Sequence, residues 1–119
     1  MTITFYWYPN CGTCKKAKQW FDSHQIDYNS IHIVKDPPSK EQLTEFIHKS
    51  KLPAKKFFNT SGKVYRELNM KDKLKEASEE EMVSYLASDG MLIKRPIVTD
   101  GQNVTVGFNE EIFRETWLS

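Results

Sequence analysis

Apolar residues change their spacing along the chain, and each change marks a predicted element. Residues 3–8 are a short run of β-branched and aromatic side chains, which indicates a buried strand. After Cys14, apolar residues recur at helical spacing and predict a helix that ends near Ser23-His24. Residues 26–33 predict a second strand. A strand, a helix and a strand with a short return predict a right-handed βαβ unit with parallel strands.

The middle of the chain predicts helices with defined starts. Residues 39–42 read Ser-Lys-Glu-Gln, a capping box that opens a helix closed by Leu52-Pro53, and residues 78–81 read Ser-Glu-Glu-Glu, a second box. The helix after the second box is expected to stop at Asp89-Gly90. Phe57 and Phe58 are predicted to be core residues. Between the boxes we expect a turn at 59–62, a short helix around 64–68 and a polar surface segment at 71–77.

The last third predicts a hairpin and a helix. Two short β-rich runs, 95–98 and 104–106, flank Asp100-Gly101, which is a strong hairpin signal. Asn109 and the acidic residues after it predict the start of a final helix. The whole order is that of an α/β fold with a thioredoxin/glutaredoxin-like sheet (βαβ … ββα) and an inserted helical subdomain. Without a repeat or a linker, we expect a single domain over residues 1–119.

Composition narrows the function classes. The chain has 119 residues with 17 basic and 16 acidic side chains, a balance that gives no argument for direct nucleic-acid binding or membrane attraction. The first residues lack the pattern of a signal peptide, and two cysteines do not make a secreted disulfide framework. We therefore expect a cytoplasmic protein, and a monomer, with no cofactor and no metal.

Both cysteines lie in the loop Tyr8–Lys16, at the Cys-x-x-Cys spacing of a dithiol redox site. Cys11 is expected at a helix N-terminus, where backbone N–H groups favour an anion, and Lys15, Lys16 and Arg95 would add positive charge. Cys11 is therefore the predicted attacking thiolate and Cys14 the resolving thiol. The alternative is that two small buried residues happen to lie three positions apart.

Three phrases of the chain resemble the ArsC family. They are Tyr-Pro-Asn-Cys-Gly-Thr-Cys at 8–14, Phe-Phe-Asn-Thr-Ser-Gly-Lys at 57–63 and Leu-Ile-Lys-Arg-Pro-Ile-Val at 92–98. The family joins glutaredoxin-linked arsenate reductases with Spx-type redox-sensing regulators. The resemblance implies a thioredoxin-like fold and a cis peptide bond at Arg95–Pro96, lying across from the cysteine loop.

The reductase branch of the family implies an oxyanion site made of one cysteine and three arginines. Only Arg95 is present here, because Asn59 and Gly107 occupy the other two arginine positions, and the reductases have serine at the position of Cys14. These differences favour intramolecular disulfide formation over arsenate chemistry. Arg66 or Arg114 could substitute only if the fold brings them near, and the ordinary interpretation is that both are solvated helix charges. The electron donor implied is glutathione with glutaredoxin, or thioredoxin.

The regulator branch implies a different partner. Spx-type proteins carry Cys-x-x-Cys and a basic residue before Arg-Pro, as Lys94 is here, and bind the C-terminal domain of the RNA polymerase α-subunit. Against this, residues 49–56 lack the glycine-containing loop expected of a regulator. We therefore expect a thiol–disulfide redox protein, arsenate reductase-like if it is an enzyme, with an Spx-type regulator as the alternative. The catalytic residues expected are Cys11, Cys14 and Arg95, supported by Lys15, Asn59 and Pro96.

Two further groups of residues have ordinary interpretations. His24, His32 and His48 fall on three separate elements without metal-ligand spacing, which favours surface or packing roles. Lysines at 15, 16, 18, 49, 51, 55 and 56 form either a solvated face or a basic face for an acidic partner or glutathione. Tyr6, Trp7 and Tyr8 either line a pocket beside Cys11 or belong to the core.

Overall fold

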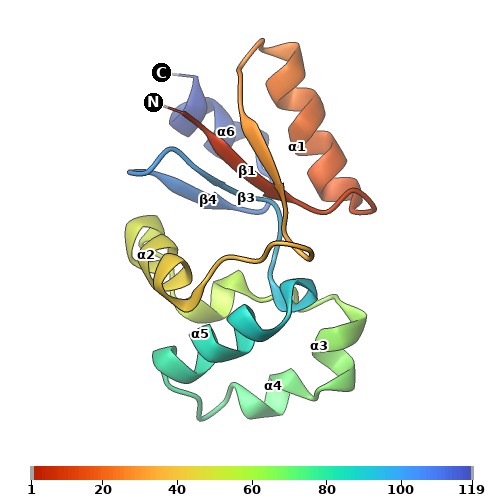
Figure 1. Cartoon of the computed structure of the whole chain (residues 1–119), viewed down its shortest axis with the longest axis vertical. Helices are drawn as coiled ribbons and strands as arrows, with labels where there is room; N and C mark the ends of the chain where they lie inside the picture. The colour runs from red at the N-terminus through yellow and green to blue at the C-terminus, as the bar shows by residue number, and fades with distance from the viewer. Residues whose placement is uncertain (1, 119) are drawn as a thin grey trace. The chain divides into compact units, whose positions relative to one another are not determined.

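The computed structural model describes residues 2–118 and divides the chain into two compact units (Figure 1). Residues 1–32 and 95–119 belong to unit 1, and residues 33–94 belong to unit 2. Met1 and Ser119, the two ends of the predicted domain, lie outside the described residues. The single-domain boundary over 1–119 stays a prediction.

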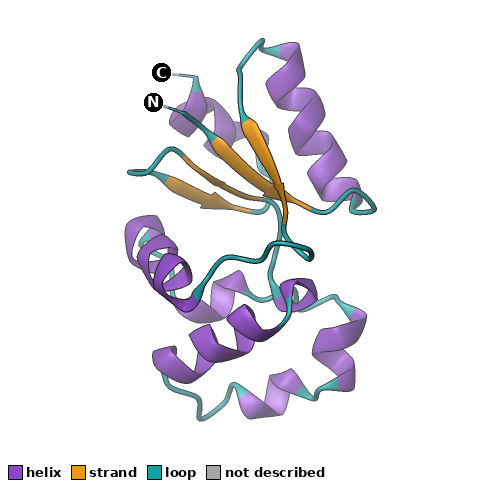
Figure 2. Cartoon of the chain, viewed as in Figure 1, coloured by secondary structure: helices purple, strands orange, loops and turns teal. Residues whose placement is uncertain are grey.

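Unit 1 is built on a four-stranded sheet, coloured orange in Figure 2. Its strands are β1 (Thr4–Trp7), β2 (Asn29–His32), β3 (Ile97–Thr99) and β4 (Val104–Val106), in the order β2-β1-β3-β4. β1 and β2 are parallel, whereas β3 is antiparallel to both of its neighbours. The predicted βαβ unit and the hairpin at Asp100-Gly101 are therefore confirmed, and Gly101 adopts the positive φ of +96° that the turn requires.

Two helices bury their apolar faces against one side of this sheet. They are α1 (Gly12–Ser23) and α6 (Glu110–Trp117), which starts at Asn109 as predicted, the Asn109 side chain accepting from the N–H of Ile112. Since alternate strand residues point to one face, the same core contains residues of strands and of both helices. Its buried members are Ile3, Phe5, Ala17, Trp20, Phe21, Val98, Phe113 and Trp117.

Unit 2 is helical. Its elements are α2 (Lys40–Ser50), η1 (Ala54–Phe57), α3 (Lys63–Glu67), α4 (Met70–Lys73), α5 (Glu79–Ser88) and η2 (Gly90–Leu92). Both capping boxes are present, with reciprocal side-chain and backbone hydrogen bonds at Ser39–Gln42 and Ser78–Glu81. Phe57 and Phe58 are buried, as predicted.

Two details of unit 2 differ from the prediction. The segment 71–77 is mainly exposed, but its first three residues belong to α4, a short helix held by the buried Met70. α5 ends at the predicted Asp89-Gly90, but the stop is not a left-handed glycine, because Asp89 is extended and η2 begins directly at Gly90. A Cβ at Gly90 would lie 2.3 Å from the carbonyl oxygen of Ile33. The glycine is required by this close backbone approach and not by its conformational freedom.

Among the described residues, none of the helices has the length and apolar character needed to cross a membrane.

Candidate functional site

The loop before α1 is a turn that presents Cys11. The N–H of Cys11 donates to the carbonyl oxygen of Tyr8 across 3.0 Å, which closes the four-residue turn Tyr8-Pro9-Asn10-Cys11. Proline at the second position favours such turns, because its φ is already fixed near the required value. Cys11 is then the N-cap of α1. The apolar spacing predicts the helix only from Cys14, so α1 begins two residues earlier than expected.

The sulfur of Cys11 is held at the positive end of α1. The backbone N–H of Cys14 donates to it across 3.4 Å, as an N-cap side chain accepts from the first turn of a helix. Partial burial opposes ionisation of this thiol. The backbone and side-chain hydrogen bonds from Cys14, with the hydrogen bond and charge of Arg95, outweigh it and lower the pKa of Cys11 below its ordinary value. Cys11 therefore has the character of a nucleophilic thiolate.

Arg95 is the cation that acts on Cys11. Its guanidinium carbon lies 5.0 Å from the centre of the Tyr8 ring, a cation–π arrangement that fixes the side chain beside the loop. The Arg95–Pro96 peptide bond is cis, as the resemblance implies. By contrast, Lys15 and Lys16 have exposed side chains on α1.

Cys14 is the buried partner. Its side chain has no exposed surface, and its sulfur accepts from the backbone N–H of Tyr8 across 3.5 Å. Burial raises the pKa of Cys14 to about 12, and the neighbouring Cys11 thiolate adds to the rise. Cys14 is thus a protonated thiol that donates toward Cys11. The pKa of Cys11 is therefore lowered and that of Cys14 is raised, although the two residues lie within one turn of backbone. Neither cysteine is in a disulfide.

Tyr8 is the member of the site that sequence analysis undervalued. Its carbonyl oxygen positions Cys11, its N–H contacts Cys14, and its ring lies under Arg95 and meets His32 edge-on at 5.6 Å. The sequence pattern predicts Tyr8 only as a pocket-lining or core aromatic. The signal that could have identified its backbone role is Pro9, since a turn with proline in second position pairs the residue before it with the residue two after it.

Gly107 and Asn59 occupy the two positions where the reductases are expected to have arginine, and Arg114 is a possible substitute. Gly107 adopts a φ of +80°, a conformation that strains an arginine, and its N–H donates to the carbonyl oxygen of Pro96 across 2.8 Å. Arg114 is exposed and pairs with Glu110 across 3.4 Å. Asn59 belongs to unit 2, where its backbone N–H donates to the carbonyl oxygen of Leu92 across 2.8 Å.

The other side chains considered earlier have local partners. Arg66 is exposed in unit 2 and donates to the carbonyl oxygen of Ser61. The histidines occupy separate places: the ring of His24 packs on Trp20, that of His32 meets Tyr8, and that of His48 lies 3.2 Å from Glu79. Within residues 2–118, no group of three or more His, Cys, Asp or Glu side chains is arranged to hold a metal ion.

Comparison with known proteins places this geometry in a family. The family model described as "ArsC family" matches residues 6–116. The chain belongs to the ArsC family. The structure is similar to that of an ArsC family related protein from Bacteroides fragilis, with 46% identity, a TM-score of 0.94 and 97% of each chain covered. The structure of a possible arsenate reductase from Streptococcus mutans UA159 is also similar, with 45% identity, a TM-score of 0.85, and 91% of this chain and 92% of that chain covered.

The relatives in sequence include an uncharacterized protein and a transcriptional regulator. The uncharacterized protein YusI of Bacillus subtilis is 61% identical over 98% of this chain and 99% of its own length. The global transcriptional regulator Spx of Streptococcus pyogenes serotype M3 is 27% identical over 94% of this chain and 82% of its own length. The chain is therefore an ArsC-family protein with a thioredoxin-like fold, related to arsenate reductase-like proteins and to Spx-type regulators.

Proposed function

We propose that this ArsC-family chain is a cytoplasmic thiol–disulfide oxidoreductase in which Cys11 attacks an oxidised substrate and Cys14 resolves the intermediate. The observation that carries the proposal is the contrast between the two sulfurs. Cys11 is a half-buried N-cap thiol whose pKa is lowered, whereas Cys14 is a fully buried thiol directly beside it whose pKa is raised to about 12. A reducing compartment suits a chain with two free cysteines.

The first step is nucleophilic attack. The Cys11 thiolate attacks one sulfur of a substrate disulfide, the substrate S–S bond breaks, and one thiolate leaves with the electron pair. Cys11 is then joined to the other half of the substrate in a mixed disulfide. Arg95 and the N–H of Cys14 have held the Cys11 sulfur ionised until this point.

The second step uses Cys14, and the first step prepares it. The Cys11 thiolate contributes to the raised pKa of Cys14, by hydrogen bonding and by charge. Once Cys11 is covalently bound, that charge is gone, so Cys14 loses its proton more easily while Arg95 still favours the thiolate. Cys14 then attacks the sulfur of Cys11, forms the Cys11–Cys14 disulfide and releases the second substrate thiolate. The substrate gains two electrons, and a thiol donor such as glutathione with glutaredoxin, or thioredoxin, returns two electrons to the disulfide.

Arsenate is the oxyanion substrate that the arsenate reductase-like relatives suggest. With arsenate, Cys11 would replace one oxygen on arsenic(V) with release of water, and attack by Cys14 on the Cys11 sulfur would leave the electron pair on arsenic as arsenite. The thioredoxin-like site offers Arg95 as its guanidinium, while Gly107 stands in the left-handed region where the reductases have arginine. We therefore propose disulfides as the preferred substrate class and arsenate as the second candidate.

The deciding experiment measures turnover with matched cysteine variants. Reduction of a small disulfide substrate and of arsenate is followed with a thiol donor for wild type, Cys11→Ser and Cys14→Ser. Cys11→Ser should abolish both activities, and Cys14→Ser should stop at a Cys11 mixed disulfide visible by mass spectrometry. Full turnover by Cys14→Ser with loss in Cys11→Ser would show that the resolving role is wrong.

A redox switch of the Spx type is the second candidate, favoured by the similarity to Spx over 94% of this chain. In this case the Cys11–Cys14 disulfide would be the signal, and the partner would be the C-terminal domain of the RNA polymerase α-subunit. A binding assay with that domain, in the dithiol and the disulfide state, tests it. Binding in one state and not in the other supports the switch, whereas no binding in either state excludes it.

A further inference from the structure

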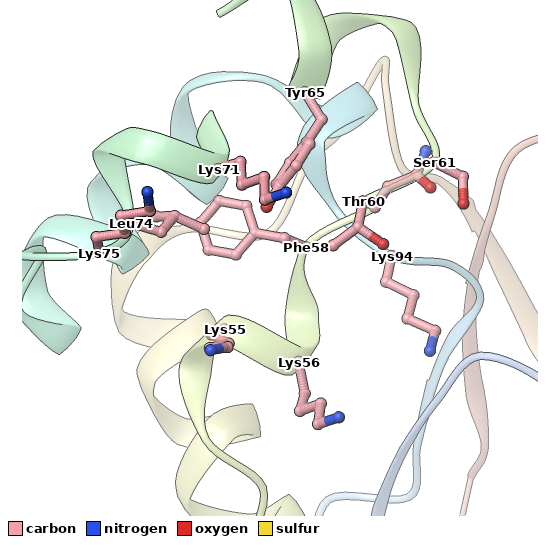
Figure 3. A pocket seen from close by; sticks show the side chains of 11 residues that line it. Lys55, Lys56, Phe58, Thr60, Ser61, Tyr65, Lys71, Leu74, Lys75 and Lys94 are labelled. Carbon is pink, nitrogen blue, oxygen red and sulfur yellow. The ribbon is translucent and has the colours of Figure 1, made fainter. Parts of the chain in front are cut away.

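Unit 2 contains a cavity that the redox chemistry does not use. Its volume is about 440 Å³, which lies within the range of small-molecule sites. The lining comes from three parts of unit 2: η1 and the turn that follows it, the stretch from α3 to the residues just after α4, and Lys94, the last residue of the unit. Figure 3 shows the side chains that line the cavity.

The charge of the lining is one-sided. Five lysines line the cavity, at positions 55, 56, 71, 75 and 94, and no aspartate or glutamate is among the lining residues. In the whole chain basic and acidic side chains are nearly equal in number, 17 against 16. The cavity therefore concentrates positive charge in a chain that is otherwise balanced, and concentrated charge of one sign attracts ligands of the other.

Most of these ammonium groups have no ion-pair partner among the residues that the structure describes. Lys75 forms an ion pair with Asp72 across 3.2 Å. Lys55, Lys56, Lys71 and Lys94 form no ion pair with any of residues 2–118. By contrast, several lysines elsewhere are paired on their own helices, among them Lys18 with Asp22, Lys49 with Glu45 and Lys63 with Glu67. The lysines around the cavity repel one another until an anion is present.

Apolar side chains lie among the lysines of the lining. Phe58 is 2% exposed and meets the ring of Tyr65 at 6.3 Å between centroids, with Leu74 beside them. In Figure 3 the two rings lie at the centre, with Lys71 and Lys75 on one side and Lys94 on the other. Polar groups of the turn, including Thr60 and Ser61, complete the rim. Lysine is a common phosphate binder, and an aromatic surface favours a planar apolar group.

We propose that this cavity binds a small organic polyanion in which at least two phosphate charges are joined to a planar apolar group, as in a nucleoside diphosphate. The lysines contact the phosphates, and the surface formed by Tyr65 and Leu74, with the buried Phe58 behind it, contacts the planar group. A cavity of this volume suits a small molecule. The inference is independent of the proposed redox function, since none of Cys11, Cys14 and Arg95 lines the cavity.

The test uses the full chain in reduced form and three probes: ADP, inorganic pyrophosphate and adenosine, measured by isothermal titration calorimetry at low salt. ADP should bind tightest. Pyrophosphate should bind at least several-fold more weakly because it lacks the planar group, and adenosine more weakly still because it lacks the charges. Affinity for ADP should fall as salt rises, because exposed charge pairs are screened.

Matched charge variants locate the site. The double variant Lys56→Gln with Lys71→Gln removes two exposed lysines of the lining and should weaken ADP binding by about fivefold or more, since each exposed ion pair contributes up to about 1 kcal/mol. The control, Lys63→Gln with Lys73→Gln, removes two exposed lysines of the same unit that do not line the cavity and should stay within twofold. Tyr65→Leu should weaken ADP more than pyrophosphate.

Four outcomes would overturn the proposal. They are no binding of ADP or pyrophosphate at low salt, equal loss in the lining and control variants, equal affinity for ADP and adenosine, and binding of an oligoglutamate peptide without binding of ADP. The last outcome would make the lysines a surface for an acidic protein segment. Circular dichroism of each variant verifies folding, so that loss of binding is assigned to charge and not to unfolding.

Discussion

The backbone N–H of Cys14 donates to the sulfur of Cys11 across 3.4 Å, so the residue that would resolve a mixed disulfide also stabilises the nucleophile that forms it. This single contact is a helix-capping interaction in which the acceptor is a sulfur instead of the usual oxygen. The contact follows from the start of α1: because Cys11 is the N-cap, Cys14 lies in the first turn of the helix, next to the Cys11 sulfur.

Alkylation should distinguish the two cysteines. A pKa of about 12 leaves roughly one Cys14 thiol in 10⁵ ionised at pH 7, and the side chain is fully buried. Iodoacetamide at pH 7 should therefore modify Cys11 faster than Cys14 by several orders of magnitude, as measured by peptide mass mapping over time. Comparable rates at the two positions in the folded protein would contradict the assigned roles.

Arg95 should control the acidity of Cys11. In Arg95→Gln the hydrogen bond and the positive charge are lost, so the pKa of Cys11 should rise, and thiolate absorbance followed against pH should move to higher pH. Alkylation at pH 6 should slow several-fold. Arg114→Gln is the matched control, because Arg114 is exposed, pairs with Glu110 and should leave the titration unchanged. A shift of the same size in both variants would mean that general charge, and not contact, sets the acidity.

Cys14 should make the fold sensitive to alkaline pH. Its pKa is raised above its ordinary value to about 12, so the neutral thiol contributes stability that is fully present below the unfolded value of about 9 and is lost as pH rises toward 12. Denaturant unfolding of the reduced protein from pH 8 to pH 11 should show wild type losing stability faster than Cys14→Ala. Because lysines and tyrosines titrate in both proteins, the informative quantity is the difference between the two curves, which should narrow above pH 9. Parallel curves would exclude this source of pH dependence.

Substitution by alanine should destabilise the fold at Gly90 but not at Gly12. Gly90→Ala places a methyl group 2.3 Å from the carbonyl oxygen of Ile33, and the shift this forces should cost about 1–3 kcal/mol of unfolding free energy. Gly12→Ala, in the first turn of α1, meets no atom within 4 Å and should be neutral or slightly stabilising. Chemical denaturation of both variants against wild type measures the contrast. Equal stability of the two variants would mean that the backbone at Gly90 relaxes freely.

The features that could be predicted from sequence are those set by neighbouring residues. The capping boxes at Ser39 and Ser78, the hairpin at Asp100-Gly101 and the dithiol loop at Cys11 each depend on a few consecutive side chains. Their physical signals are therefore complete within a short window of sequence.

The features that sequence analysis missed depend on residues far apart in the chain. The need for glycine at Gly90 comes from Ile33, more than fifty positions earlier, and α4 depends on the burial of Met70. The lysine cavity is a third case. Lys55 and Lys56 were grouped by sequence with lysines of other helices, whereas the fold joins them to Lys71, Lys75 and Lys94. The order of charged residues along the sequence does not show which of them line the same cavity in the folded chain.

The contact between Gly90 and Ile33 also has a topological consequence. Ile33 is the first residue of unit 2, and Gly90 lies four positions before its last residue. The chain therefore enters and leaves unit 2 at segments whose backbones are in contact. This contact, and not the helices of unit 2, sets the distance between the two ends of the unit. Insertions whose ends lie close together are tolerated well. The close approach of Gly90 and Ile33 therefore joins the two ends of unit 2 through backbone atoms, so substitutions of side chains within its helices need not change the spacing of these ends.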